Sequence, residues 1–457
     1  MENLPEEKAT DILHRYPPGG YKQLLALAYP VIITMISQTA MWLADNMMVG
    51  RLGTTQFAAV GVGGSIVWTL FAFYNGLISS ANTFISQDYG AKRYRHIGET
   101  VWHYIYLSLI SYVFLIITMP FSSIILRWVS SSDEFTSYGN IYARFRLYAG
   151  LPAFISFSMA GFFRGIGNTK TPMFIAIFCN AFNILANLLL IFGIWIFPRL
   201  EVTGAALATL LSSVLSAVIY LIFVFSRKYN TVYLTKKFYR FNLSLFRRLI
   251  RVGLPMGVQF FLDSGSFTLF GLVIARMGEI QFAASNAAMS LMSTSFMPLV
   301  GISIATTTLV GQFIGAKLPE YARKSGYAAI KLGLMYACFT AVCFITLGRH
   351  LVAIIIKDPE VIKLGAKILI LAGIFQISDA FGICSNGALR GAGDTRFIMF
   401  VGILYAWFLF IPLALLLGVV LKGGVVGAWI GATIYIIIYG ITAFLRFRRG
   451  KWQSIKI

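Results

Sequence analysis

Long apolar runs recur along this chain and leave few folds open to it. Many are about 20 residues long, the length of helix that crosses the hydrocarbon core of a bilayer. Strands of a membrane barrel would be about 10 residues long and would alternate in polarity, which these runs do not. We therefore predict an all-α polytopic membrane protein with twelve transmembrane helices. The predicted spans are residues 25–50, 56–80, 100–126, 143–163, 171–196, 203–226, 252–276, 281–310, 326–347, 362–389, 396–421 and 424–445.

The composition supports this class of protein and excludes others. Hydrophobic residues make up 58% of the sequence and charged residues 12%, so too few polar groups remain to cover a soluble globule. The formal net charge is +21, but Lys and Arg are spread over short loops between spans, so we expect no nucleic-acid partner. The four cysteines lie within or beside apolar runs, where packing explains them better than disulfides or metal.

The positions of the basic residues predict the orientation in the membrane. Most Lys and Arg fall in the N-terminus, in alternate loops that include 227–251, and in the C-terminus. Because cytoplasmic loops are enriched in these residues, we expect a multi-pass protein of the cell inner membrane with both termini cytoplasmic. Residues 1–22 carry several acids before any apolar run, so we expect no cleavable signal peptide.

One loop sequence occurs twice: RGIGNTKTP at residues 164–172 returns as RGAGDTR at 390–396. Other residues match at nearly the same spacing, about half the chain. They pair Pro30 with Pro255, Gly53 with Gly278, Gly76 with Gly301, Gln87 with Gln312 and Asp133 with Asp358. A shared spacing of this size indicates a six-span unit written twice.

The duplication predicts two lobes. Because six is an even number of spans, both copies enter the membrane from the same side, so we expect two six-helix bundles related by a pseudo-twofold axis along the membrane normal. The predicted lobes are residues 1–226 and 252–457, and the basic segment 227–251 is the predicted cytoplasmic linker. A cleft between such lobes can open alternately to either side.

Three acids lie within predicted spans: Asp45, Asp263 and Asp379. A carboxylate inside a bilayer costs about 2.5 to 3.5 kcal/mol or more, so each is a candidate functional residue. At a rise of about 1.5 Å per residue, Asp263 and Asp379 each lie roughly 17 Å from the cytoplasmic face, and Asp45 lies nearer the outer surface. The repeat aligns Gln38 with Asp263 and Ala153 with Asp379, so only the second copy carries the acidic pair.

An acidic pair of this kind is typical of a site that couples transport to an ion. Two carboxylates close together in a low dielectric cannot both stay charged and bare, so one binds a proton or the pair holds a cation. Gln259, Ser285 and Asn286 are candidates to complete an oxygen cage for sodium around Asp263 and Asp379. The alternative is that each acid accepts hydrogen bonds from its neighbours and only packs the bundle.

Further polar and aromatic residues are candidates for a substrate cavity. Asn183 and Asn187, four residues apart, share one helix face and either line a cavity in the first half or make packing hydrogen bonds between helices. Aromatic rings bind flat organic cations through their faces. The cavity candidates are Gln38, Trp42, Asn183, Asn187, Gln259, Ser285, Asn286 and Phe375.

Together these features resemble the multidrug and toxin extrusion (MATE) family, over nearly the whole chain from about Pro30 to Phe444. The likeness rests on the two six-span halves, the Gln-x-x-Gly-Ala pattern at Gln87 and Gln312, the DPEV stretch at 358–361 and the two RGxG[ND]T loops. The resemblance implies a V-shaped secondary transporter that exports organic cations in exchange for sodium or protons. It implies no enzymatic activity and no cofactor besides the coupling ion, and we expect a monomer.

Within that family the chain looks most like the NorM-type branch, in which an acid follows a Gly-Leu-Pro motif by eight residues, as Asp263 does here. Asp379 and Asp45 match two further aspartates of the branch. Phe375 stands where the branch often has Tyr, and Asp263 where it commonly has Glu, so the choice between sodium and proton stays open. Asn187 stands where another branch has an acid, which argues against a proton site confined to the first half.

Two other functions remain as alternatives. A flippase for lipid-linked oligosaccharides shares the two-lobed architecture but would line its cavity with Arg and Lys, and Lys331 is the basic residue that lies clearly within a predicted span. An intramembrane aspartyl protease would use the GxGD sequence at 391–394 with Asp379 as its partner. The first half writes the same loop with Asn168 in place of the acid, so we interpret both loops as tight turns.

Overall fold

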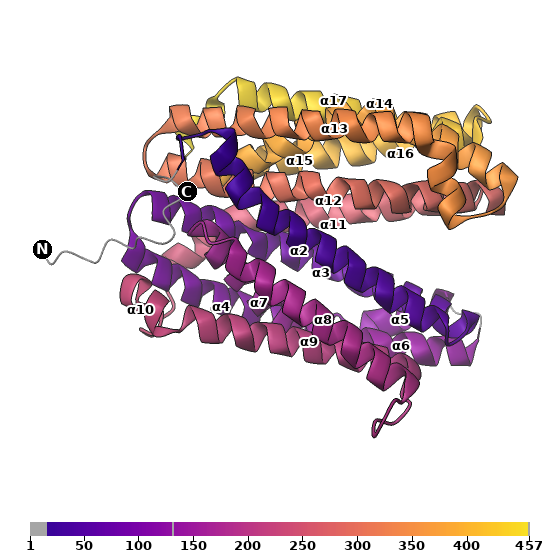
Figure 1. Cartoon of the computed structure of the whole chain (residues 1–457), viewed down its shortest axis with the longest axis horizontal. Coiled ribbons are helices and arrows are strands. Elements are labelled where there is room, and N and C mark those ends of the chain that lie inside the picture. The colour runs from indigo at the N-terminus through magenta and orange to yellow at the C-terminus, as the bar shows by residue number, and fades with distance from the viewer. Residues whose placement is uncertain (1–15, 130–131, 456–457) are drawn as a thin grey trace, which may run out of the picture. The chain divides into compact units, whose positions relative to one another are not determined.

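The computed structural model describes residues 16–129 and 132–455, and over those ranges every regular element is a helix (Figure 1). The prediction of an all-α protein is confirmed for that part of the chain. Most of the N-terminal segment, where we predicted no cleavable signal, lies outside the described residues. The helices are α2 (Tyr21–Gly50), α3 (Thr54–Gly90), α4 (Tyr94–Ile117), α5 (Met119–Val129), α6 (Asp133–Tyr148), α7 (Gly150–Gly165), α8 (Lys170–Phe192), α9 (Glu201–Val224), α10 (Arg227–Tyr233), α11 (Leu243–Ala275), α12 (Glu279–Gly315), α13 (Pro319–Ile355), α14 (Pro359–Gly391), α15 (Thr395–Tyr405), α16 (Ile411–Leu415) and α17 (Gly424–Arg448), with π-helical turns η1 (Ala406–Phe410) and η2 (Leu416–Val420) and a short 3-10 turn η3 (Lys451–Ser454).

Eleven helical segments of the described chain are long and apolar enough to cross a membrane. The predicted span at 143–163 falls on α6 and α7, which are 16 residues each and therefore short on their own. Ala149 joins them, and its N–H donates to the Phe145 carbonyl while its own carbonyl accepts from the Ala153 N–H, each at 3.0 Å. The chain is a multi-pass membrane protein, and the count of twelve spans stays a prediction.

Contacts divide the chain into two compact units. Unit 1 comprises residues 1–32 and 258–457, and unit 2 comprises residues 33–257. Both boundaries fall inside helices, within α2 and within α11, whereas the predicted lobes ended at 226 and began at 252. The predicted linker 227–251 holds α10 and the first turns of α11 and belongs to unit 2.

In unit 1 the central helix is α14, which packs against α12, α13 and α17 (Figure 1). It starts at Asp358, whose carboxylate accepts the N–H groups of Glu360 at 2.8 Å and Val361 at 3.2 Å, and Pro359 occupies the first helical position. The sequence DPEV at 358–361 is therefore a helix start. Phe270, Phe410 and Trp429 are buried in one apolar core of this unit, and Phe447 and Trp452 in another.

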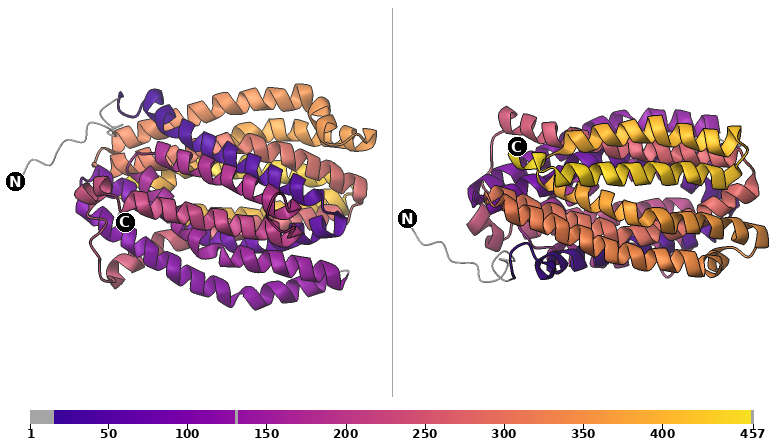
Figure 2. Two further views of the ribbon diagram at one scale, coloured as in Figure 1. Left: turned by 60° about the horizontal axis from the view of Figure 1, so that its bottom comes forward. Right: turned by 90° about the horizontal axis from the view of Figure 1, so that it is seen from above.

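In unit 2 α3 packs against α4, α6 and α7, while α8 pairs with α9. Figure 2 shows the helices from two further sides. Glycines let the helices of this unit approach closely, as small residues do in membrane bundles. A Cβ on Gly76 of α3 would lie 2.5 Å from the Met256 carbonyl, and one on Gly253 would lie 2.5 Å from the Leu77 carbonyl. The backbones of α3 and of the first part of α11 therefore lie in close contact at these two glycines.

The backbone repeats as the sequence does. α3 and α12 are both 37 residues long and begin 225 positions apart, at Thr54 and Glu279. Residues with a positive φ recur in pairs, at Gly53 and Gly278 (149° and 122°), Lys92 and Lys317 (57° and 59°), and Gly167 and Gly393 (84° and 87°). The duplicated unit is therefore visible in local conformation, and the pseudo-twofold axis between the copies stays a prediction.

The copies differ in several helices: α13 and α14 are continuous where the first copy has α4 with α5 and α6 with α7, and a further difference lies in the helix after the second RGxG loop. α8 is regular over 23 residues, whereas its counterpart in unit 1 contains the two π-helical turns η1 and η2. In η1 the N–H of Ile411 donates to the carbonyl of Ala406, five residues back. Such turns often mark functional positions in helices.

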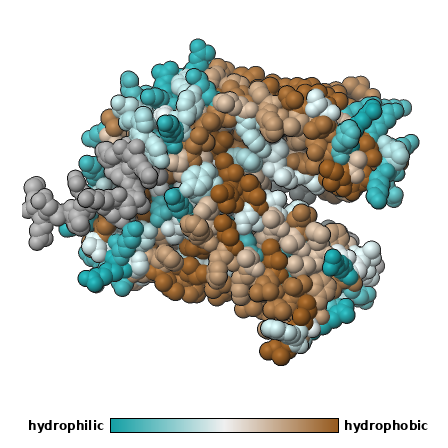
Figure 3. All heavy atoms as spheres, viewed as in Figure 1, coloured by the Kyte–Doolittle hydropathy of each residue, from teal (hydrophilic) through white to brown (hydrophobic). Residues whose placement is uncertain are grey.

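The side-chain surface of each unit fits a bilayer. Hydrophilic side chains gather at the ends of the helices, and hydrophobic ones cover the stretches between them (Figure 3). Large apolar residues such as Met335, Phe339 and Val342 on α13 are more than half exposed at 60–70%, which a lipid-facing helix allows and a water-facing one does not.

Candidate functional site

Asp263 lies on α11 in unit 1 and is surrounded by polar partners. Gln259, one turn earlier on the same helix, makes a side-chain hydrogen bond with it. Arg390 of α14 donates to the side-chain amide oxygen Oε1 of Gln259 at 3.2 Å, and its guanidinium lies over the Phe260 ring at 4.8 Å. The positive charge of Arg390 acts on the Asp263 carboxyl group, so this acid has a counter-ion within its own unit.

A tyrosine of α17 closes the same network. The Tyr439 hydroxyl accepts the amide N–H of Asn386 at 2.8 Å and that of Gln259 at 3.4 Å. The neighbouring Gly440 brings α17 against α14, because a Cβ there would lie only 2.1 Å from the carbonyl oxygen of Ser378. Polar side chains therefore tie α11, α14 and α17 together, and α17 lies against the α14 backbone at Ser378, the residue before Asp379.

Asp379 of α14 is the second acid of the predicted pair. The structure gives its carboxyl group no hydrogen bond or ion pair with any other described residue, and burial is the main influence on it. Both carboxyl groups lie within electrostatic range of the buried Tyr435 hydroxyl. The second half therefore holds one compensated acid and one acid without a charged partner among the described side chains.

The remaining second-half candidates lie elsewhere. Ser285 is buried and accepts the indole N–H of Trp429 at 3.1 Å, and Phe375 is packed in the apolar core with Phe270 and Phe410. Asn286 is exposed. Among Gln259, Ser285 and Asn286, the residues predicted to complete a sodium site, only Gln259 makes a described contact with Asp263. On α12, Ser285 faces α17 and Asn286 is exposed.

Asp45 anchors a separate cluster in unit 2. Asn187 of α8 donates its side-chain N–H to the Asp45 carboxylate and also to the side-chain oxygen Oδ1 of Asn183, the latter at 3.2 Å. The charge of Arg146 on α6 acts on Asp45 as well. Gln38 and Trp42 on the same helix are exposed, Trp42 by 62%. The two asparagines, predicted to share a helix face, are thus positioned by the first-half acid.

Asn187→Ala is expected to lower the free energy of unfolding by about 2 kcal/mol, because it removes a hydrogen bond to a charged group in a buried setting. Thermal unfolding of the purified protein in detergent measures this change. Asn286→Ala is the matched control, since Asn286 is exposed and only its backbone carbonyl takes part in a described bond. Equal melting temperatures for the two variants would contradict a structural link between Asn187 and Asp45.

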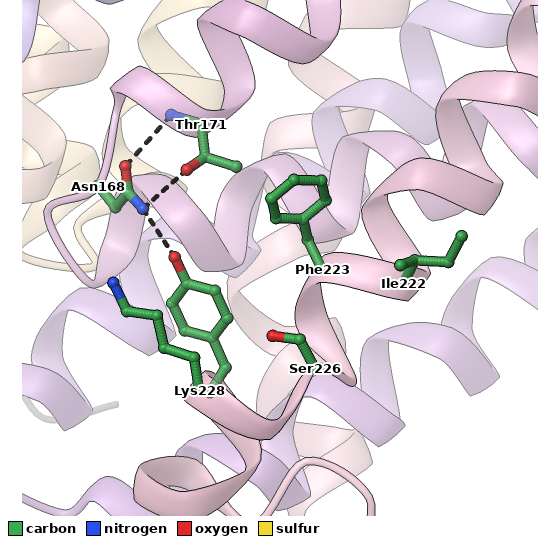
Figure 4. A pocket seen from close by; sticks show the side chains of 7 residues that line it. Asn168, Thr171, Ile222, Phe223, Ser226 and Lys228 are labelled. Carbon is green, nitrogen blue, oxygen red and sulfur yellow. Dashed lines mark hydrogen bonds between the residues drawn. The ribbon is translucent and has the colours of Figure 1, made fainter.

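The two RGxG loops act as turns within their own units. Asn168 accepts the N–H of Thr171 at 3.2 Å and donates to the Tyr229 hydroxyl of α10 at 3.0 Å, beside a cavity of about 390 Å³ (Figure 4). Its counterpart Asp394 accepts the Arg446 guanidinium of α17 at 2.8 Å. Each loop is thereby fastened to a later helix of the same half.

This geometry bears on the protease alternative. Asp394 is held by Arg446, and Asp379 lies 12 residues before the end of α14 at Gly391. That stretch of helix is about 18 Å long at the usual rise per residue. The two aspartates therefore cannot share a proton, as the pair of an aspartyl protease must.

Four residues of the second-half network escaped the sequence reasoning: Arg390, Asn386, Tyr435 and Tyr439. We interpreted Arg390 as a loop residue at the cytoplasmic edge. The two tyrosines are four residues apart in an apolar span, a spacing that places both hydroxyls on one helix face and that was available in the sequence. Among the described residues no three His, Cys, Asp or Glu side chains gather as a metal site would require.

Comparisons with known proteins cover both halves of the chain. A family model described as MatE matches residues 30–189 and 255–416. The multidrug resistance protein MdtK of Yersinia pestis (strain Pestoides F) is 29% identical over 439 residues, which are 93% of this chain and 95% of that protein. MdtK of Yersinia enterocolitica (serotype O:8 / biotype 1B) is 30% identical over the same shares. A crystal structure of MATE in complex with MaL6 has a TM-score of 0.89 at 22% identity and covers 97% of this chain and 99% of that one.

Proposed function

Because the chain belongs to the MatE family of multidrug efflux transporters, we propose that it is a secondary active antiporter that exports small organic cations in exchange for sodium or protons. It would work in the inner membrane as a monomer of the NorM-type branch, with both termini in the cytoplasm. The chemistry is transport across the bilayer, with no bond made or broken.

The observation that carries the proposal is the unequal environment of the two acids in unit 1. Asp263 is buried, but the charge of Arg390 and a hydrogen bond with Gln259 offset part of the cost of keeping it charged. Asp379 has no such partner among the described side chains. A bare carboxylate in a low dielectric is costly, so Asp379 is the group that must take up a proton or a sodium ion.

The Asp379 carboxylate can also account for the exchange of the substrate for the coupling ion. A cationic substrate and the coupling ion both neutralise Asp379, so binding of one weakens the hold on the other. An ion that binds one conformation better than another shifts the equilibrium between them, and by no more than its difference in affinity. Uptake of the ion from outside and of the substrate from inside then gives antiport.

Transport into proteoliposomes with separately imposed gradients tests the proposal. Either a sodium gradient or a proton gradient alone is expected to drive ethidium uptake against its own gradient, and collapse of that gradient by an ionophore is expected to stop it. The two gradients, applied one at a time, identify the coupling ion. Uptake that proceeds equally with neither gradient would contradict coupled antiport.

The flippase alternative gains little from the structure. A carrier of a lipid-linked pyrophosphate needs basic side chains free to face its cargo. Arg390, the basic residue of the network described above, is engaged by Gln259 and lies over Phe260. Turnover of a lipid-linked sugar by the reconstituted protein, without drug transport, would favour the flippase.

A further inference from the structure

The segment between α10 and α11, residues 234–242, is held along α4 by hydrogen bonds, and we call it the linker strap. Trp102 donates its indole N–H to the Thr235 carbonyl at 2.9 Å, and Tyr106 donates its hydroxyl to the Tyr239 carbonyl at 2.7 Å. The backbone N–H of Asn242 donates to His103 Nε2 at 2.8 Å. The strap is thus a built part of unit 2 rather than a loose connection.

The side chains that the strap turns outward are basic and aromatic. Lys236, Lys237 and Arg240 are exposed, and between them Phe238 and Phe241 are exposed by 66% and 50%. Further exposed basic and apolar side chains adjoin the strap at Arg95, Leu243, Arg247 and Arg248.

The acids nearby do not cancel this charge. Asp88 is buried in an ion pair with Arg93 at 2.7 Å, and Glu99, which accepts the side-chain amide of Asn242 at 3.2 Å, offsets one of the several positive charges. The outer face of the strap therefore keeps a positive potential next to two apolar rings.

The rings themselves are fixed in place. Phe238 meets the Trp102 ring edge to face at 5.1 Å, and Phe241 stacks on the His103 ring at 5.9 Å. Each ring keeps one side against α4 and presents the rest outward. An exposed ring held this way is costly in water and favourable at a bilayer surface, where apolar and polar surroundings meet.

We propose that the linker strap is a binding surface for anionic phospholipids of the bilayer in which the protein sits. With α10, the strap forms the connection between two helices long and apolar enough to cross the membrane, Glu201–Val224 and Leu243–Ala275. It therefore lies at a membrane face whichever way the chain is oriented. Clusters of Lys and Arg beside a span attract anionic headgroups. Membrane orientation alone accounts for the positive charge, but not for two fixed, outward-facing phenylalanines interleaved with it. This surface is independent of the proposed transport reaction.

The test compares two triple variants with the same loss of charge. Lys236→Gln/Lys237→Gln/Arg240→Gln alters the strap. Lys317→Gln/Arg323→Gln/Lys324→Gln is the control, because these residues are exposed in the loop between α12 and α13 and at the start of α13, two membrane crossings along the chain from the strap. Native mass spectrometry of the full-length protein, with phosphatidylglycerol or phosphatidylcholine added, measures how much of each lipid stays bound.

The strap variant is expected to retain phosphatidylglycerol about tenfold less well than the unaltered protein, with phosphatidylcholine unchanged and the control near the unaltered level. Phe238→Ser/Phe241→Ser is expected to weaken retention, and Phe238→Leu/Phe241→Leu to keep it. Equal loss in the strap and control variants, or no preference for phosphatidylglycerol in the unaltered protein, would overturn the proposal. If the triple variant fails to fold, the single changes Lys236→Gln and Arg240→Gln replace it under the same criteria.

Discussion

Asp379→Asn is expected to abolish ion-coupled efflux, with at least about a tenfold loss of ethidium transport and no loss of protein in the membrane. Asparagine keeps the size of the side chain but neither binds a proton nor carries the charge that a cation needs. Because no described side chain pairs with Asp379, the change leaves no partner stranded. The fold is therefore expected to melt at nearly the same temperature while transport is lost.

Asp263→Asn is expected to stop transport too, but with a second effect. It removes a negative charge that acts on the buried Arg390 guanidinium, which is expected to destabilise the fold by about 1 to 3 kcal/mol. The double variant Asp263→Asn/Arg390→Gln is expected to recover melting temperature without recovering transport. Ethidium accumulation in cells and thermal unfolding of the purified protein report the two effects separately.

Glu279→Gln serves as the control for both acids, because Glu279 is exposed at the start of α12 and its charge has no role in the proposed exchange. Undiminished efflux in both Asp263→Asn and Asp379→Asn would remove the basis of the proposed function. Loss in Asp263→Asn alone would instead move the exchanged ion to the acid beside Arg390.

Gly440→Ala is expected to lower the free energy of unfolding by about 2 kcal/mol and to impair transport strongly. The added Cβ would lie 2.1 Å from the carbonyl oxygen of Ser378, and this oxygen belongs to the backbone of α14, so no side chain can move aside. One of the two helices must shift, and overpacking of this kind typically costs 1–3 kcal/mol. Because Asp379 follows Ser378, the shift also displaces the proposed ion-binding carboxyl group.

Gly271→Ala is the matched control for this change. It lies in α11 of the same unit, and a Cβ there would meet no atom within 4 Å. Since alanine favours a helix over glycine by about 1 kcal/mol, this variant is expected to melt at the same temperature or slightly higher. Melting of Gly440→Ala at the temperature of Gly271→Ala would show that α14 and α17 do not pack as described.

Much of the fold could be predicted from apolar run length, because a bilayer permits few ways to satisfy a backbone. The span at 143–163 was also predicted, but its division into α6 and α7 could not be, since Ala149 and Gly150 give no helix-stop signal that differs from an ordinary small pair in a membrane helix. The compact units could not be read from the repeat either. Their boundaries lie inside α2 and α11, where packing rather than a loop divides the chain.

The residues of the candidate site could also be predicted only in part from the sequence. An acid in an apolar span is conspicuous, so Asp45, Asp263 and Asp379 could be found by position alone. Arg390 was assigned to a loop because it begins the RGAGDT sequence. Side chains on a helix point back toward its N-terminus, so an arginine in the last turn of α14 reaches inward past its own position to Gln259. Ser285 and Asn286 were predicted from proximity in sequence, which does not say which way a helix is rotated.

The π-helical turns of unit 1 mark a difference in backbone geometry between the two halves. Gly167 and Gly393 in the RGxG loops are 226 positions apart, yet Gly204 and Gly427 lie against the carbonyls of Leu190 and Leu417, which are 227 apart. From that glycine to that leucine the second copy is therefore one residue longer than the first, and the π turn η1 lies within this stretch. The extra residue falls in the helix that carries Gly402, whose Cα faces Gln259 and Asp263. The helix that passes Asp263 in the second copy thus has a backbone geometry that its counterpart α8 in the first copy lacks.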